Sequence, residues 1–588
     1  MAYRAPVAEM LFTLDHAAGL ARARSEGLYD DIDAETIAAV IEEAGAFATD
    51  IIAPLNRVGD REGARFSDGV VTTAPGYAQA YRAWTAAGWN GVSAEEAHGG
   101  QALPTAVWAL TSELWAQGSM AFGLCPLLTH GGIECLERHG SEEVKRTYLP
   151  KLVSGEWTAT MNLTEPQAGT DLALLRTRAE SAGDGSYRIR GQKIFITYGE
   201  HDMAENILHL VLARLPDAPE GVRGISLFLV PKLLVEEGGA LGARNDLVCA
   251  GIEHKLGIHG SPTCTMAFGE GEGATGYLVG EENRGLACMF TMMNNARLAV
   301  GLQGVAIAER ATQAALGYAH ERRQGRADNG ASPSPIVTHP DVRRMLMTMR
   351  ALTSAARGIC YRAAVELDRA HRATDEMARK AAHERASLLI PVAKAFSTDI
   401  GCEVASLGLQ VHGGMGYVEE TGAAQHLRDA RIAPIYEGTN GVQAIDLATR
   451  KLAQSDGAAA EQVFSSIDET IAGLRGAGSG LGESAARLGE ARAALGRATA
   501  FMRDPATGQA AILAGATPYL RLFGLTLGGA ALAEDALAAM ASNQDGGARV
   551  ALARFHAENL LGETDGLARS VVDGAASLGE AADAALAL

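Results

Sequence analysis

Residues 410–443 read QVHGGMGYVEETGAAQHLRDARIAPIYEGTNGVQ. The stretch joins a glycine-rich turn to one carboxylate, Glu437, that follows the apolar run APIY. Apolar neighbours raise the pKa of a carboxylate because burial penalises its charged form, and such a group can act as a general base near neutral pH. Gly438 lacks a Cβ, so a substrate can approach the backbone closely there. The structural alternative is a carboxylate beside a helix start that Thr439 or Asn440 caps.

The composition of the whole chain limits the class of protein. The chain has 588 residues, of which 47% are hydrophobic, and a net charge of -19. This length suggests three or four domains, and the acidic balance argues against non-specific binding to nucleic acid or membranes. The seven cysteines form no CxxC pair. They indicate reduced, mostly buried thiols rather than a disulfide framework or a zinc site.

Targeting and metal-binding signals are not found in the sequence. The N-terminus MAYRAPVAEMLFTLDHAAGL mixes charged with apolar residues and is not expected to be a signal peptide. No uninterrupted apolar run is long enough to span a bilayer, so no membrane span is predicted. Neither HExxH nor a Walker A motif occurs, and we predict no metal site. We therefore expect a cytoplasmic protein.

Hydrophobic periodicity changes along the chain and predicts a mainly α protein with a central antiparallel β domain. Asp33 can cap the first long helix, which begins AETIAAVIEEAG. Short β-rich segments with few intervening helices disfavour a parallel Rossmann sheet, and long helical periodicities then predict an antiparallel bundle. The stretch AQSDGAAAEQ is a plausible linker to further alanine-rich helices. The predicted segments are an N-terminal extension (1–34), a helical domain (35–158), a β domain (159–282), a helical bundle (283–451) and a C-terminal helical domain (460–588).

Two short motifs in the predicted β domain could contact a ligand. The loop TEPQAGTD (164–171) can present hydroxyls and backbone N–H groups to a ring carbonyl or a phosphate, although an ordinary strand turn has the same composition. The strand KIFIT (193–197) places Phe195 and Thr197 on one face, because side chains repeat every two residues. An aromatic ring beside a hydroxyl can wall a flat heterocycle; the alternative is a core phenylalanine.

Three further features have a functional and a structural interpretation. In ERRQGR (321–326), Arg322 or Arg323 could bind a phosphate, or could only stabilise the end of a helix. Arg297 lies in an otherwise apolar helix, and we expect it to have an anionic partner. The GxGxxG at 271–276 follows a predicted strand but precedes no helix, so we predict a solvent-exposed loop there.

The order and spacing of TEPQAGTD, KIFIT, ERRQG, QVHGGMGY and RDARIAPIYEGTNGVQ resemble the acyl-CoA dehydrogenase family. The similarity covers roughly residues 35–451. The N-terminal YRAPVAEMLF and the added C-terminal helices resemble the longer subfamily that includes 3-methylmercaptopropionyl-CoA dehydrogenases. The family fold is a helical domain, a β domain and a helical bundle. Its members bind FAD between the β domain and the bundle, without a Rossmann site.

The resemblance implies an oxidoreductase mechanism. Glu437 would remove the α-proton of an acyl-CoA while a hydride leaves the β-carbon for flavin N5, which gives a trans-2-enoyl-CoA. Some members carry the base on an earlier helix; here that position is Ala296, which leaves Glu437 as the base. The residues expected to contact FAD are Met161, Leu163, Thr164, Gly169, Thr170, Phe195, Thr197, Arg322, Gln410, Gly413, Gly414 and Thr439. Those expected to line the acyl-CoA path are Thr170, Asn294, Arg297, Tyr436 and Gly438.

Two positions depart from the family pattern. Phe195 stands where the family usually has a tryptophan, so flavin packing there differs. Thr170 replaces the serine of many members but keeps a hydroxyl. Arg322 and the turn Gln410–Gly414 would reach the FAD of a neighbouring subunit, which implies at least a homodimer.

Partners and substrate also follow from the resemblance. The expected electron acceptor is an electron-transfer flavoprotein, and the favoured substrate is 3-methylmercaptopropionyl-CoA, which would place the protein in dimethylsulfoniopropionate catabolism or a related β-oxidation. Alternatives are a short- or medium-chain acyl-CoA dehydrogenase, an acyl-CoA oxidase, and a non-catalytic acyl-CoA or flavin scaffold.

Overall fold

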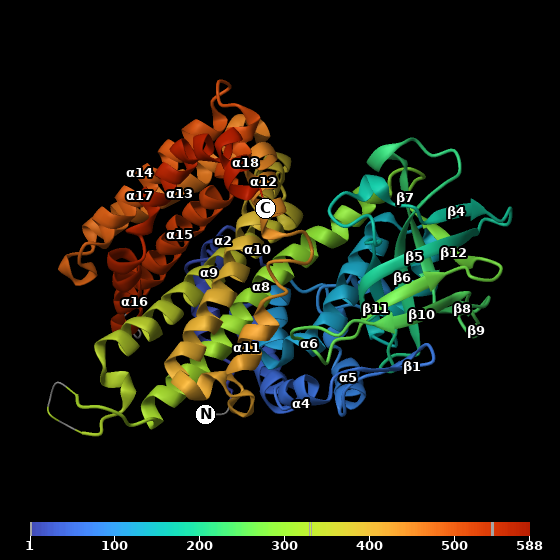
Figure 1. The fold of residues 1–588 in the computed structure, drawn as a ribbon, viewed down its shortest axis with the longest axis horizontal. Coiled ribbons are helices and arrows are strands. Elements are labelled where there is room, and N and C mark those ends of the chain that lie inside the picture. The colour runs from blue at the N-terminus through green and yellow to red at the C-terminus, as the bar shows by residue number, and fades with distance from the viewer. Residues whose placement is uncertain (1–2, 328–329, 331, 543–545, 588) are drawn as a thin grey trace. The chain divides into compact units, whose positions relative to one another are not determined.

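The computed structural model describes residues 3–327, 330, 332–542 and 546–587. The chain divides into two compact units (Figure 1). The first, called the helical unit, comprises Met1–Ala46, Thr105–Gln117 and Arg297–Leu588. The second, called the sheet unit, comprises Phe47–Pro104 and Gly118–Ala296. The division falls inside two long helices, α6 (Thr105–His139) and α8 (Gly285–Glu321).

The sheet unit is built around an eight-stranded sheet with the order β10-β11-β5-β12-β7-β6-β3, in which β4 pairs with β5 and β6. Its middle strands are buried on both faces, and one of these faces packs against residues of α6 and α7. The strands are β3 (Trp157–Asn162), β4 (Arg178–Ser181), β5 (Tyr187–Thr197), β6 (Asn206–Arg214), β7 (Ile225–Pro231), β10 (Leu247–Ile252), β11 (Thr263–Phe268) and β12 (Ala274–Val279). The helices and small hairpins are α4 (Leu55–Glu62), α5 (Tyr77–Ala86), α7 (Glu142–Ser154), β1 (Arg65–Ser67) with β2 (Val70–Thr72), and β8 (Leu233–Val235) with β9 (Leu241–Arg244).

The sheet is mainly antiparallel, as predicted, but β3 corrects that prediction at one edge. Strand β3 runs parallel to β6, with Trp157 opposite Asn206, and β4 also meets β6 in parallel. A parallel pair needs a crossover connection, and the long path through β4 and β5 provides it. Short-range alternation cannot reveal this because it does not say which strands become neighbours.

The helical unit has three long helices, α8, α9 (Pro340–Arg372) and α10 (Glu376–His412), where the sequence predicts them. The N-terminal helices are α1 (Val7–Asp15), α2 (Leu20–Ser25) and α3 (Ala34–Phe47). The Asp33 carboxylate accepts a hydrogen bond of 2.7 Å from the Thr36 N–H, which confirms the predicted cap of α3. Two short helices, α11 (Ala423–Ala430) and α12 (Asn440–Asp446), flank the loop that carries Glu437.

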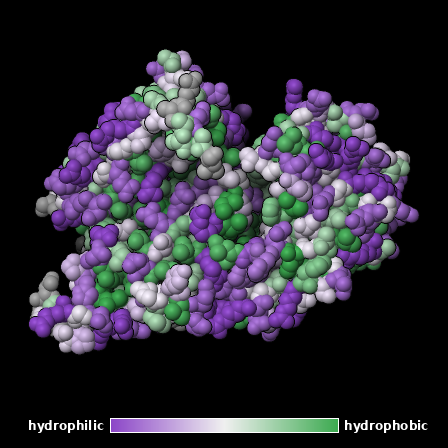
Figure 2. Space-filling model, viewed as in Figure 1, coloured by the Kyte–Doolittle hydropathy of each residue, from purple (hydrophilic) through white to green (hydrophobic). Residues whose placement is uncertain are grey.

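The C-terminal helices of this unit surround one apolar helix, α15 (Gln509–Ser542), which packs against α9, α10, α12, α13, α14, α16 and α17 (Figure 1). By length and composition α15 alone among the described residues could cross a membrane, yet 56% of its apolar window is buried within the protein. Polar residues predominate on the visible side of α13 and α14 (Figure 2). The other helices are α13 (Ala458–Gly476), α14 (Ser484–Arg503), α16 (Gly546–Asn559), α17 (Glu563–Asp573) and α18 (Glu580–Leu586). Because α13 begins at Ala458, the predicted linker is already helical over its second half.

Candidate active site

Glu437 sits in a strained loop between α11 and α12. Its φ angle is 56°, and that of Gly438 is 86°. A positive φ is uncommon for a residue with a Cβ, and such strain persists only where the surrounding structure holds it. Two hydrogen bonds hold the loop: the Asn440 N–H donates to the Pro434 carbonyl (2.9 Å), and the Thr439 hydroxyl caps α12 by accepting from the Val442 N–H (3.2 Å). Thr439 is therefore the helix cap considered as the structural alternative, and Glu437 beside it still has an unusual backbone conformation.

Burial and nearby cations have opposite effects on the pKa of Glu437. Burial raises the pKa of the Glu437 carboxyl to about 7, while the cations Arg297 and Lys394 limit that rise. The residue is half-buried, so part of its surface remains accessible. Within the described residues, no group accepts a hydrogen bond from the Glu437 N–H. The loop thus presents a carboxylate that can exchange a proton near pH 7 and, beside it, an available backbone donor.

Helix α10 holds the side chain of Asn440, at the start of α12, through hydrogen bonds. The buried Lys394 donates from Nζ to Asn440 Oδ1 over 2.9 Å, and the Thr398 hydroxyl reaches the same oxygen at 3.2 Å. In return, Asn440 Nδ2 donates to the Ala395 carbonyl (3.1 Å) and to Asp399 Oδ1 (2.8 Å). We call these five residues the Asn440 clamp. Every hydrogen-bonding atom of the amide is satisfied, so the start of α12 is fixed to α10.

Sequence reasoning did not single out Lys394. Burial lowers the pKa of its ammonium group to about 8, and the attraction of Glu437 works against that fall. A signal was available, because a lysine inside the apolar run LLIPVAKAF is rarely buried without a partner. That partner is an asparagine on a different helix, and the local sequence does not identify it.

Arg297 has anionic neighbours but no close ion pair. It is 7% exposed and lies in α8, as expected for a residue aimed inward. The carboxylates Asp446 and Glu437 attract it, in line with the expected anionic partner. Within the described residues neither of them forms an ion pair with it, and its Nε has no hydrogen-bond partner. The side chain of Asn294, one turn earlier, lies outside the described residues.

Two more contacts shape the surroundings of Glu437. The Tyr436 hydroxyl donates to Gln303 Oε1 of α8. Gln443 Nε2 donates to the Gly438 carbonyl over 3.3 Å, and a Cβ at Gly438 would lie 2.7 Å from that same nitrogen. Only glycine fits here without displacing Gln443. Tyr436, Glu437 and Gly438 are thus positioned by helices on both sides of the loop.

In the sheet unit, the loop after β3 lies along β5. The Ile194 N–H donates to the Thr164 carbonyl (2.9 Å), and the Thr160 hydroxyl donates to the Thr197 carbonyl (2.7 Å). These bonds bring Thr164 and Thr197, two of the predicted FAD contacts, to neighbouring positions along β5. Met161 is buried, Leu163, Thr164 and Thr197 are half-buried, and Gly169, Thr170 and Phe195 are exposed.

A bulge interrupts β5 at Phe195. Cys264 of β11 pairs with Ile196, whereas Met266 pairs with Lys193, so Ile194 and Phe195 share one partner residue. Phe195 adopts a φ of 60° and its side chain is 59% exposed. The simple two-residue repeat that predicted its orientation does not hold through a bulge. The result excludes a core phenylalanine, the structural alternative for this residue.

A buried ion pair anchors the same loop. Lys193 Nζ lies 2.8 Å from Glu165 Oε1 and donates to the Leu163 carbonyl at 3.0 Å. Burial opposes the charge on Glu165, but Lys193 and the Thr177 and Arg176 donors outweigh it and lower the pKa of Glu165 to about 2. Both residues lie inside quoted motifs, yet sequence reasoning did not pair them. The pair fixes the loop to β5.

These residues fit FAD, the cofactor that the resemblance implies. Phe195 has a backbone in the left-handed region and an exposed side chain, which can offer its surface to a flat ring system. A Cβ at Gly169 would meet nothing within 4 Å, so the loop leaves open space beside that surface.

The remaining predicted contacts form a separate group. Arg322 follows the end of α8, and Gln410, Gly413 and Gly414 lie at the end of α10; all four are exposed. Gln410 lies eleven residues beyond Asp399 of the Asn440 clamp, or about 16 Å along a helix that rises 1.5 Å per residue. This group is therefore distinct from the Glu437 loop.

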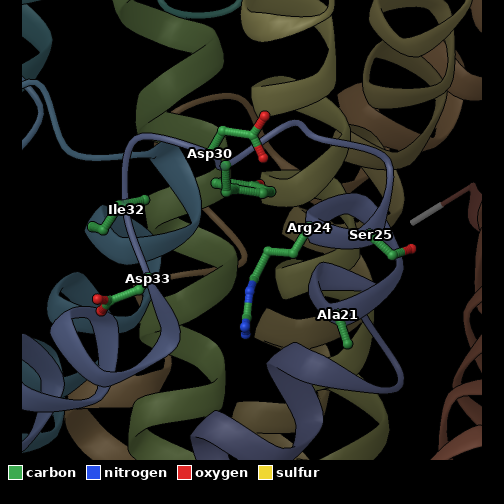
Figure 3. Close-up of a pocket in the computed structure, with 7 residues that line it drawn as sticks. Ala21, Arg24, Ser25, Asp30, Ile32 and Asp33 are labelled. Atoms are coloured by element: carbon green, nitrogen blue, oxygen red, sulfur yellow. The ribbon is translucent and has the colours of Figure 1, made fainter.

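One cavity of about 420 Å³ lies in the N-terminal part of the helical unit (Figure 3). The Arg24 side chain points into it. Its polar groups already have partners: Arg24 lies 3.9 Å from Asp15, Asp33 caps α3, and the Tyr29 hydroxyl donates to Asp368. None of the predicted site residues lines this cavity, and we assign it no chemistry.

Known proteins share this organisation. Three domains described as the N-terminal, middle and C-terminal domains of acyl-CoA dehydrogenase match residues 34–156, 160–270 and 283–452. A fourth, described as acetyl-CoA dehydrogenase C-terminal like, matches residues 463–582. The chain is 47% identical over 572 residues to 3-methylmercaptopropionyl-CoA dehydrogenase of Ruegeria pomeroyi, which covers 96% of this chain and 97% of the relative.

Solved structures share the fold over most of the chain. ACDH-11 of Caenorhabditis elegans in complex with C11-CoA has a TM-score of 0.75 at 21% identity and covers 89% of this chain and 87% of its own. An acyl-CoA dehydrogenase of Bacillus anthracis complexed with FAD has a TM-score of 0.71 at 21% identity and covers 92% and 89%. With the domain matches and the near full-length relative, these findings establish that the chain belongs to the acyl-CoA dehydrogenase family of FAD-dependent enzymes.

Proposed function

We propose that Glu437 is the base that removes the α-proton of an acyl-CoA, with formation of a trans-2-enoyl-CoA. The observation that carries the proposal is the setting of this carboxyl, whose pKa is raised to about 7 in a strained, half-buried loop. A base with a pKa near the working pH is present in its ionised form in a substantial fraction of the molecules and still takes up a proton readily. Ala296, the alternative position, has no group that accepts a proton.

The thioester carbonyl needs donors while the α-proton leaves, because negative charge develops on its oxygen. The available Glu437 N–H is a suitable donor. A preorganised donor of this kind contributes roughly 3–4 kcal/mol to the transition state. We propose that the left-handed backbone at Glu437 serves both needs, since one residue then supplies the base and a donor.

When bound, FAD supplies the acceptor for the hydride that leaves the substrate β-carbon. We propose that the surface formed by the loop after β3 and by β5 binds the cofactor. The resemblance to the family implies that the group at the ends of α8 and α10 serves the cofactor of a second subunit. The residues proposed for FAD are Met161, Leu163, Thr164, Gly169, Thr170, Phe195, Thr197, Arg322, Gln410, Gly413, Gly414 and Thr439.

For the acyl-CoA path we propose Thr170, Asn294, Arg297, Tyr436 and Gly438. Arg297 supports this assignment because a buried guanidinium without an ion pair is suited to an incoming acceptor group. The relative from Ruegeria pomeroyi favours 3-methylmercaptopropionyl-CoA as the substrate. A panel of butyryl-, octanoyl- and 3-methylmercaptopropionyl-CoA ranked by kcat/KM tests this: the thioether substrate should rank first, and a higher rank for octanoyl-CoA would favour a medium-chain enzyme.

The base is tested with Glu437→Gln, which preserves size and removes the proton acceptor. We expect the purified variant to keep its FAD and to lose anaerobic bleaching of the flavin by substrate about 10²–10⁴-fold, the usual contribution of a general base. Glu419→Gln, in an exposed turn of the same stretch, is the matched control and should bleach as the wild type does. Near-normal bleaching by Glu437→Gln would refute the assignment.

We further propose a cytoplasmic homo-oligomer, at least a dimer, that passes electrons to an electron-transfer flavoprotein, with dimethylsulfoniopropionate catabolism as its setting. Peroxide release without an added acceptor would instead identify an oxidase. A flavin that no acyl-CoA bleaches would identify a non-catalytic scaffold.

A further inference from the structure

One of the C-terminal helices, α15, packs against the two helices that hold the loop of Glu437. Helix α15 packs against α10, which carries the Asn440 clamp, and against α12, which begins at Asn440. All of these helices belong to the helical unit. The C-terminal domain therefore contacts both α10 and α12, the two helices that position the loop of Glu437.

The closest approach is made at Gly524 of α15. A Cβ added to Gly524 would collide with the ring of Phe396 and would lie 2.9 Å from the Cβ atom of Phe396. Phe396 is 1% exposed and follows Lys394 and Ala395, two members of the clamp. Helix α15 can therefore press directly on the turn of α10 that holds Asn440 only because residue 524 is a glycine.

An ion pair makes a second connection between the same helices. Arg521 of α15 lies 3.2 Å from Glu403 of α10 and also attracts Asp399, whose carboxylate accepts from Asn440 Nδ2. The contact from Gly524 to Phe396 is steric and that from Arg521 is electrostatic. The first contact meets Phe396, which follows Ala395 of the clamp, and the attraction of Arg521 reaches Asp399 of the clamp.

We propose that the C-terminal domain is a brace for the catalytic base: through Gly524 and Phe396 it fixes the Asn440 clamp, which in turn holds the strained loop at Glu437. This inference rests on the proposed role of Glu437. Gly524 and Phe396 are positioning residues, since neither contacts the loop itself. Their effect passes through Asn440 to the backbone at Gly438 and Glu437.

The charged groups that surround Glu437 indicate which measurement would respond to a loosened brace. Arg297 of α8 and Lys394 of α10 face the carboxylate. Asp446 and Arg450 lie near Arg297, and Asp399 lies near Lys394. A shift of α10 would move Lys394 and Asp399, which it carries, relative to Glu437. A loosened brace should therefore change the pH dependence of the reaction as well as its rate.

The test uses the full-length holoenzyme with Gly524→Ala and, as a gentler variant, Phe396→Leu. We expect kcat to fall about tenfold, because small displacements of a base are costly, while KM changes less than twofold. The rising limb of kcat against pH should move by half a pH unit or more, an estimate from the influence of one nearby charge. Hydrogen exchange of the amides in 438–446 should become faster, and FAD content should stay at the wild-type level.

Gly528→Ala is the matched control. It lies one turn further on α15, and its Cβ would come within 2.7 Å of Ala355 Cβ on α9, not of α10. It should lower the melting temperature to a similar degree and leave the pH profile and the exchange of 438–446 unchanged. If Gly528→Ala reproduces every effect of Gly524→Ala, or if both α10-facing variants leave exchange in 438–446 unchanged, the brace is refuted. Hydrogen exchange reports on the brace even if Glu437 proves not to be the base, so the two proposals fail separately.

Discussion

Lys193 of the sheet unit and Lys394 of the helical unit are both fully buried, and burial lowers the pKa of each to about 8. Each ties a segment with predicted site residues to a neighbouring element. They differ in their partner: Lys193 forms an ion pair with Glu165 at 2.8 Å, whereas Lys394 donates to the neutral amide of Asn440 at 2.9 Å.

The difference in partner separates a structural role from an electrostatic one. A carboxylate in contact with a lysine cancels most of the electric field of its positive charge. Lys193 therefore acts mainly by fixing the loop after β3 in place. The amide of Asn440 carries no opposite charge, so the positive charge of Lys394 acts on the carboxylates near it, Glu437 first and then Asp399. In the interior a charge acts over longer distances than in water. The same residue type thus fixes a loop in one unit and, in the other, acts on the charge of Glu437, the proposed base.

Breaking the ion pair tests the first half of this comparison and should have the largest effect on stability. Glu165→Gln leaves Lys193 as an uncompensated buried charge and should lower the free energy of unfolding by about 3–5 kcal/mol, measured by denaturant titration. Glu180→Gln, exposed on β4, is the control and should change it little. The wild type should lose the contribution of the pair as the pH falls from 4.5 towards 2, because the pKa of Glu165 is lowered to about 2. An unchanged unfolding curve for Glu165→Gln would contradict the assigned role.

Removing the second lysine should affect catalysis more than folding. Lys394→Met takes a cation from the surroundings of Glu437 and should raise the pKa of the base above its present value of about 7. The rising limb of kcat/KM against pH should then move up by about one unit, equivalent to about 1.4 kcal/mol. At pH 7 the loss should be several-fold and at pH 9 much smaller. Lys380→Met, exposed on the same helix, should keep the wild-type profile; a limb that stays in place in Lys394→Met would show that its charge does not reach the base.

The smallest effect is expected where neither lysine is involved. Thr439→Ala removes the cap of α12 but leaves the Asn440 clamp intact. It should lower the free energy of unfolding by about 1 kcal/mol, the usual contribution of an N-cap, and leave the pH profile in place. Thr449→Ala, whose hydroxyl only donates to the Ile445 carbonyl, is the control. A shift of the pH profile in Thr439→Ala as large as that in Lys394→Met would mean that the cap, and not the charge, governs the base.

Local patterns predicted much of this architecture. The long helices predicted over 294–323, 341–372 and about 381–409, the cap at Asp33 and the mainly antiparallel strands all depend on near neighbours. The structure has these helices as α8, α9 and α10, together with the cap and the mainly antiparallel sheet. The five segment boundaries and the roles of the site residues stay predictions. What local patterns missed depends on contacts between distant segments: the parallel pairing of β3 with β6, the bulge at Phe195 and the partner of Lys394.

By itself the sequence determined that a carboxylate followed by glycine, Glu437 and Gly438, would enter a capped helix from an apolar run. It also determined the family, because five separated motifs occur in one order. Only the tertiary structure decided that Asn440 would be held by a buried lysine, and that Gly524, far along the chain, would bring α15 against Phe396. The physical reason is range: periodicity and capping act between residues a few positions apart, whereas desolvation and close packing depend on whatever segment the fold places beside them.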